Sequence, residues 1–266
     1  MDREKLAGQI EKSTTWLARN LFFYEKTGST NDDIKQMANE GALNGTLVVA
    51  DRQTAGRGRR GRTWISPKGE SVYMSLLLRP KCMPNQASAL TLVMALAVAE
   101  AMEELAYGKS GIKWPNDIVM NGKKICGILT EMGLEQTTID YVVIGVGINV
   151  NQSFFDEEIA TTATSIALEL GKKISRAELI GRILHYFEKE YAEFEKTYDL
   201  TSIVERYNQH LPNRDRQVRV LDPKGEYEGF ALGVNSQGEL MVKCQNDEIV
   251  HVYAGEVSVR GIYGYV

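Results

Sequence analysis

The segment Gly111–Met132, GIKWPNDIVMNGKKICGILTEM, decides how the middle of this chain folds. Two apolar, strand-like runs flank Asn121-Gly122, a dipeptide that favours the type I′ turn because both of its central residues need a positive φ. A third run, IDYVVIGVGINVN at residues 139–151, has the same strand-like character. We therefore expect a β-hairpin that a further strand extends into a sheet.

Helices and more strands are expected on both sides of this hairpin. A short helix should lie within residues 1–20, and a second should follow Ser29 or Thr30, either of which could cap it. Residues 86–105 are apolar almost all round, which indicates a buried helix. Further helices are expected between 163 and 209, with a break near Gly171. This mixture predicts an α+β domain over residues 1–212, with helices packed on one face of a mixed β-sheet.

The composition changes after Pro212. Five short strand patterns, separated by turns, follow one another from residue 216 to the C-terminus. No helix is needed there, so residues 213–266 are expected to form a small, SH3-like β-barrel.

Composition excludes several classes of function. The chain has 266 residues, 43% hydrophobic and 25% charged, with a net charge of −4. This acidity argues against nucleic-acid or membrane partners attracted by the whole molecule. The three cysteines form an odd number without CxxC spacing, and the charged N-terminus has no apolar signal region. A cytoplasmic protein is the expectation.

The strongest local anomaly is residues 53–64, QTAGRGRRGRTW. Four arginines fall within six residues of an acidic protein: Arg57, Arg59, Arg60 and Arg62. The glycines match GxGxxG in form, but the segment that follows is extended and broken by Pro67, whereas the dinucleotide fingerprint requires a helix there. A mobile anion-binding loop is the better interpretation, because arginine forks match phosphate and carboxylate. We expect it to be disordered when empty; a solvated basic loop or an RNA contact is the alternative.

The hairpin itself contains candidate polar groups. Asn116-Asp117, which follow an extended Trp-Pro pair, could offer oxygen ligands to Mg²⁺ or could simply form an Asx turn. Strict alternation places Lys124 and Cys126 on one face of their strand and Gly127 on the other. Lys124 would then lie at the mouth of a pocket, unless it is an ordinary lysine at a strand end.

Glycines alternate in GVGINVN. Gly145 and Gly147 weaken a strand and point to the same face, which therefore lacks side chains. A flat ligand or a wide helix could fill the space.

In this order, the segments STN, GRGRRGR after a glutamine, KWPND, KKxxGIL and GxGINVN resemble the biotin protein ligases. The resemblance spans about residues 23–151. It implies the biotin-ligase catalytic fold, which is like that of class II aminoacyl-tRNA synthetases, followed by a C-terminal β domain.

The resemblance also implies roles for individual residues. Catalytic cations would be Arg57, Arg59 and Lys124. Biotin would be held by Ser29, Thr30, Asn31, Gln53, Arg57, Gly58, Arg59, Lys124, Gly127, Gly145 and Gly147. ATP would be held by Arg59, Arg60, Arg62, Trp64, Asn116, Lys124 and Asn149. Asp117 would be a carboxylate on the Mg²⁺ side.

The implied reaction has two steps. Biotin and ATP form biotinyl-5′-AMP and pyrophosphate, and a lysine of an acceptor, such as a biotin carboxyl carrier protein, then displaces AMP. Loop closure would protect the intermediate from water. Only about 20 residues precede the first core strand, too few for the winged helix that some family members carry, so we expect no operator binding. A homodimer through apolar edge strands is possible.

Two other interpretations compete with this one. A lipoate or octanoate ligase of the same superfamily would share the fold and the adenylation chemistry, although the loop and Trp64 follow the biotin pattern. A non-enzymatic RNA-binding module would need aromatic stacking partners or a broader basic face. The scattered histidines and Cys126 are interpreted as structural.

Overall fold

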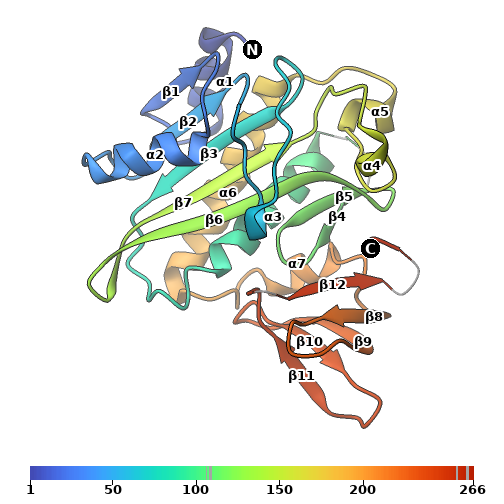
Figure 1. The fold of residues 1–266 in the computed structure, drawn as a ribbon. Coiled ribbons are helices and arrows are strands. Elements are labelled where there is room, and N and C mark those ends of the chain that lie inside the picture. Colours follow the sequence, from blue (N-terminus) through green and yellow to red (C-terminus); the bar gives the residue numbers. More distant parts are fainter. Residues whose placement is uncertain (106, 108–109, 256, 262–263) are drawn as a thin grey trace.

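The computed structural model describes residues 1–105, 107, 110–255, 257–261 and 264–266, and its centre is a seven-stranded sheet (Figure 1). The strand order is β1 (Leu21–Tyr24), β2 (Leu47–Ala50), β3 (Val72–Leu78), β7 (Thr138–Ile148), β6 (Lys123–Glu135), β5 (Asp117–Met120) and β4 (Ser110–Lys113). β1 and β2 are parallel and every other pair is antiparallel, so the sheet is mixed as predicted.

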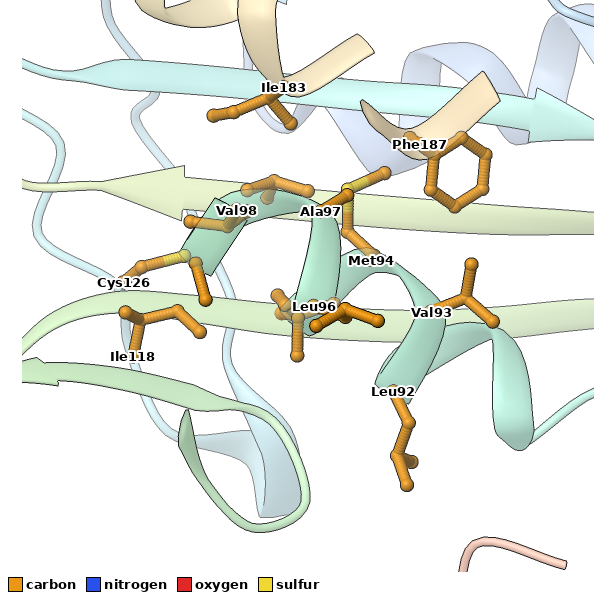
Figure 2. Packing of buried hydrophobic residues seen from close by; sticks show 14 of the residues in the cluster. Leu92, Val93, Met94, Leu96, Ala97, Val98, Ile118, Cys126, Ile183 and Phe187 are labelled. Carbon is orange, nitrogen blue, oxygen red and sulfur yellow. The ribbon is translucent and has the colours of Figure 1, made fainter. Parts of the chain in front are cut away.

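Three long helices cover one face of this sheet: α1 (Arg3–Ser13), α3 (Ala89–Glu104) and α6 (Arg176–Thr197). α3 contacts both α6 and strands of the sheet, and Figure 2 shows Leu96 and Val98 in the packed layer together with Phe187 of α6. Burial on all sides explains why its sequence is apolar all round. None of the described helices is long and apolar enough to cross a bilayer.

The helix α2 (Thr30–Asn39) lies on the opposite face. Its Ile34 and Ala38 pack with Val48 and Val143, in a cluster separate from the main core. The prediction that the helices pack on one face is therefore confirmed for the three long helices. It is wrong for α2, which buries its apolar residues against the opposite face of the sheet. α2 contacts β2, β3 and β7, and the neighbouring part of this face carries the functional site.

The shorter elements also follow local sequence signals. Asn121 and Gly122 have φ values of 48° and 75°, as the predicted hairpin turn requires. Gly171 ends a helix in the left-handed conformation, at the predicted break. The short helices are η1 (Arg59–Gly61), α4 (Glu157–Ala160), α5 (Ile166–Leu170) and α7 (Val204–Gln209), of which η1 and α4 were not predicted.

A second, antiparallel sheet of five strands follows, as predicted. Its order is β11 (Ile249–Val252), β10 (Leu240–Lys243), β9 (Tyr227–Val234), β8 (Arg216–Leu221) and β12 (Ser258–Gly261). Buried hydrogen bonds connect this second sheet to the rest of the protein. Trp114 Nε1, between β4 and β5, donates to the Gly238 carbonyl oxygen at 3.0 Å, and Asn208 Nδ2 of α7 donates to the Val234 carbonyl oxygen at 2.9 Å. A domain boundary between residues 212 and 213 remains a prediction.

The packing of α3 yields a stability prediction. Leu96 is fully buried, so Leu96→Ala should lower the free energy of unfolding by about 2–5 kcal/mol through lost burial and a cavity. Leu168→Ala is the control, because Leu168 is 50% exposed and should change it by less than about 1 kcal/mol. Urea unfolding measures both, and similar values would contradict the packing described.

Candidate functional site

Three glycines form a floor without side chains on the face of the sheet that carries α2. Gly127 pairs with Gly147 across β6 and β7, and Gly145 lies two residues from Gly147 on the same face. A Cβ at Gly147 would lie 2.6 Å from Trp64 Cε2, and one at Gly145 would collide with the Asn31 side chain. The prediction that the glycines leave this face without side chains of its own is confirmed. Trp64 of the loop and Asn31 of helix α2 occupy the space.

A polar wall rises at one edge of the glycine floor. Gln53 Oε1 accepts from the Thr30 backbone N–H at 2.9 Å, and Ser75 Oγ lies 2.8 Å from Thr30 Oγ1 and 2.5 Å from Asn31 Oδ1. On the other side, Asn31 Nδ2 donates to Glu131 at 2.6 Å. The wall therefore presents both donors and acceptors, as a ligand with an N–H and C=O pattern requires.

The glycine–arginine loop lies over this floor, and its cations find acceptors there. Its disorder in the absence of ligands stays a prediction. Arg57 NH1 donates to Asp32 Oδ2 at 2.8 Å, and this hydrogen bond lowers the pKa of Asp32. Arg59 donates to Asn116 Oδ1 at 2.9 Å and to the Ala254 carbonyl oxygen at 3.1 Å. The loop is thus held to α2, to the hairpin and to the C-terminal sheet.

Lys124 lies on the glycine face, which corrects the strict alternation of the sequence analysis. The register between β5 and β6 shifts between Ile118 and Val119, so the alternation changes phase after Lys124. A Cβ at Gly127 would lie 3.2 Å from Lys124 Nζ. Cys126 instead points into the core, where burial raises the pKa of its thiol, in agreement with a structural role.

Asp117 is the carboxylate beside Lys124. It pairs with Gly127 in the sheet, and its Oδ1 lies 2.6 Å from Lys124 Nζ. Its Oδ2 accepts from the Tyr265 hydroxyl at 2.6 Å. Lys113 is buried nearby, and burial lowers its pKa to about 8. One carboxylate therefore lies among several cations, an arrangement that favours the binding of further anions.

Two adjoining cavities use these residues. The cavity above the glycine floor has a volume of about 50 Å³, and its neighbour, between the loop, the hairpin and the C-terminal sheet, has about 280 Å³. Five residues line both, namely Gly58, Arg59, Trp64, Asn116 and Lys124. Because the cavities share a wall, two ligands could lie end to end with cations at the junction.

The structure brings together all the residues that sequence reasoning singled out. The smaller cavity is lined by every residue predicted for biotin, and the larger by Asp117 and every residue predicted for ATP. Their individual roles remain predictions.

Some residues of the site were missed. Ser75 could have been recognised in the sequence, because it is a polar residue within the apolar run 71–79; the structure buries it fully. The sequence indicated Glu131 more weakly, because strand alternation places it on the same face as Gly127. Nothing in the sequence indicated Tyr265.

A resident metal site finds no support among the described residues. They contain no group of three or more His, Cys, Asp or Glu that could hold a metal ion. Asp117 could supply one carboxylate, which fits Mg²⁺ only when phosphates and water provide the remaining ligands.

Comparisons with known proteins agree with this geometry. A model of the biotin/lipoate A/B protein ligase family matches residues 24–149, and a model of the biotin protein ligase C-terminal domain matches residues 215–260. The bifunctional ligase/repressor BirA of Bacillus subtilis is 40% identical over 248 residues, which make up 92% of this chain and 76% of that protein.

Two further relatives match almost over their full length. The biotin–[acetyl-CoA-carboxylase] ligase of Mycobacterium tuberculosis is 33% identical over 265 residues, 97% of this chain and 95% of that protein. The solved structure of the biotin protein ligase from Aquifex aeolicus in complex with biotin and ATP has a TM-score of 0.80 at 32% identity, covering 91% of this chain and 99% of that one. With this fold, these motifs and these relatives, the chain belongs to the biotin/lipoate A/B protein ligase family, as a biotin protein ligase.

Proposed function

We propose that this protein activates biotin with ATP to biotinyl-5′-AMP and then transfers biotin to a lysine of an acceptor protein, such as a biotin carboxyl carrier domain. The observation that carries the proposal is the shared wall between the two cavities. Lys124 and Arg59 line both cavities, which supports a reaction beside these two cations between a carboxylate in the smaller cavity and the α-phosphate of a nucleotide in the larger one.

The polar wall would select the ureido ring of biotin. A ureido group has two N–H donors and one strong acceptor, and a buried group of this kind is costly unless each is paired. Thr30 and Asn31 line the smaller cavity and would offer such partners beside the glycine floor. Ser75 is fully buried and hydrogen-bonds to both of them. Ser29 and Gln53 complete this wall in our proposal.

Binding requires Trp64 to move. About 50 Å³ has room for only one or two water molecules, and Trp64 covers Gly127 and Gly147. Since Trp64 also lines the larger cavity, we propose that it turns toward the nucleotide, where its ring can stack on adenine beside Asn116, with Asn149, Arg60 and Arg62 around the nucleotide.

In the first step, an oxygen of the biotin carboxylate attacks the α-phosphorus of ATP, the bond to the β-phosphate oxygen breaks and pyrophosphate leaves. The reactants are both anions, so the main work of the protein is to align them and to neutralise charge. Lys124, Arg57 and Arg59 provide that charge, with Gly58 allowing close approach of the loop. Mg²⁺, bound to ATP as substrate and facing Asp117, would neutralise phosphate charge.

In the second step, a neutral lysine amine of the acceptor attacks the carbonyl carbon of the mixed anhydride, and AMP leaves with the bonding electrons. The closed loop would hold the adenylate and exclude water until the acceptor arrives. A homodimer and a cytoplasmic location, the latter favoured by three free cysteines, remain predictions.

The experiment that tests the function offers the protein a biotin acceptor domain and a lipoyl domain, each with ATP and either biotin or lipoate. Mass spectrometry should show ATP-dependent addition of biotin to one lysine of the biotin acceptor. Labelling of the lipoyl domain alone would overturn the proposal in favour of a lipoate ligase.

The floor gives the first prediction at this site. In Gly147→Ala, the new methyl group would occupy the space of the ligand, so biotin binding measured by calorimetry should weaken about 100-fold or more. Gly8→Ala is the matched control, since a Cβ at Gly8 meets nothing within 4 Å and helix α1 favours alanine. Unchanged biotin affinity in Gly147→Ala would remove the floor from the binding site.

Lys124→Ala should reduce biotin-dependent ATP–pyrophosphate exchange by about 10²–10³-fold, since a preorganised cation at the reacting centre is lost. Lys81→Ala replaces an exposed lysine beyond β3 and should leave exchange unchanged. Normal exchange in Lys124→Ala would exclude this lysine from adenylate formation.

Arg59→Gly should release biotinyl-AMP, because the contacts to Asn116 and Ala254 that keep the loop closed are lost. Nonspecific biotinylation of lysines on a bystander protein should then rise about tenfold or more. Blotting of an added albumin measures it, and retention of the adenylate at the wild-type level would count against closure by Arg59.

A further inference from the structure

We propose that Tyr265, in the C-terminal tail, is a positioning residue of the nucleotide site that controls how strongly Asp117 holds Lys124. This inference rests on the proposed ligase function, and it gives the C-terminal segment a part in adenylate formation. The two oxygens of the Asp117 carboxylate have different partners.

The geometry links the tail to the reacting centre through two contacts. The Tyr265 hydroxyl donates to Asp117 Oδ2 at 2.6 Å, and Lys124 Nζ lies 2.6 Å from Asp117 Oδ1. Asp117 is only 8% exposed, so its charge is stabilised mainly by these neighbours and not by water. Tyr265 therefore acts on Lys124 through Asp117, without touching it.

Both donors draw on the same negative charge. A hydroxyl that donates to a carboxylate disperses part of its charge and leaves less for the ammonium group on the other oxygen. Burial and the neighbouring Asp117 raise the pKa of Tyr265, so the tyrosine remains a protonated donor at physiological pH. Lys124 is consequently freer to turn toward an incoming carboxylate or phosphate.

The ring of Tyr265 has a second contact. Lys113 Nζ lies 4.2 Å from the ring centroid, a cation–π distance. Lys113 is buried and faces the larger cavity, which Arg260 also lines. The aromatic face stabilises the buried ammonium group of Lys113, which has lost its hydration, but it does not neutralise the positive charge. Lys113 therefore keeps its charge available for phosphate.

Val266 lies close to the end of β12, since a Cβ on Gly261 would collide with the Val266 carbonyl oxygen. This close approach places Tyr265 at the wall of the larger cavity.

Two substitutions separate the hydroxyl from the ring. Tyr265→Phe should lower kcat for biotin-dependent ATP–pyrophosphate exchange about tenfold, the effect of one hydrogen bond to a charged group, with KM for biotin unchanged. Its ATP affinity, followed by fluorescence of Trp64 and Trp114 at the cavity, should stay within about twofold of wild type. Tyr265→Ala should in addition weaken ATP binding about tenfold, because Lys113 loses its aromatic partner.

Tyr253→Phe is the matched control, since Tyr253 is 68% exposed, lies before β12 and does not line the cavity. A wild-type kcat in Tyr265→Phe would overturn the proposal, as would a parallel rise of KM for biotin with a lower melting temperature, which would indicate a purely structural role. If the wild-type protein shows no biotin-dependent exchange, the ligase function fails. The ATP-affinity measurements then decide on Tyr265, and equal affinity in Tyr265→Ala would exclude it from the site.

Discussion

The site depends on the missing side chains of three adjoining positions in the central sheet. At Gly127, Gly145 and Gly147 the backbone itself is the surface, so a ligand can lie directly against the strands. A Cβ at Gly145 would collide with Asn31 of α2 and one at Gly147 with Trp64 of the loop, while one at Gly127 would crowd Trp64. Everything else in the site is arranged around this floor. α2 and β3 supply a polar wall at one edge, and the arginine loop covers it.

Charge is the second organising element. The protein as a whole is acidic, yet Lys113, Lys124, Arg59 and Arg260 gather at the larger cavity. Among the described residues that line this cavity, only Asp117 is acidic. Joining a carboxylate to a triphosphate requires overcoming the repulsion of two anions, and fixed cations in a partly enclosed cavity do so without reorganising at the moment of reaction. The C-terminal sheet contributes to this arrangement, both through the carbonyl oxygen of Ala254 and through Tyr265.

Much of this could be predicted because the decisive features are local. The Asn121-Gly122 turn, the apolar helix α3 and the glycines of β7 follow from steric rules within a few residues. The face of β6 on which Lys124 lies could not be predicted, because it depends on a register shift between β5 and its partner strand β6. The contacts of the loop could not be predicted either, because its acceptors, such as Asp32 and Ala254, lie far along the chain.

The other features that could not be predicted are contacts between residues far apart in the sequence. Tyr265 lies 148 residues from Asp117, and no local pattern links a terminal tyrosine to a hairpin carboxylate. The opposite placement of α2 has a similar origin, because a small apolar stripe does not say which face of a sheet it will cover. The contact of Tyr265 and the face covered by α2 are therefore set by tertiary packing and not by the local sequence.

A crystal structure of the protein with biotin and a non-hydrolysable ATP analogue would test whether the glycine floor binds biotin. The biotin ring should lie against Gly127, Gly145 and Gly147, with Trp64 displaced from the floor. Its carboxylate should point to Lys124, and the nucleotide should lie in the cavity lined by Lys113 and Arg260. Biotin bound elsewhere, with Trp64 and Asn31 still packed on the glycines, would contradict it.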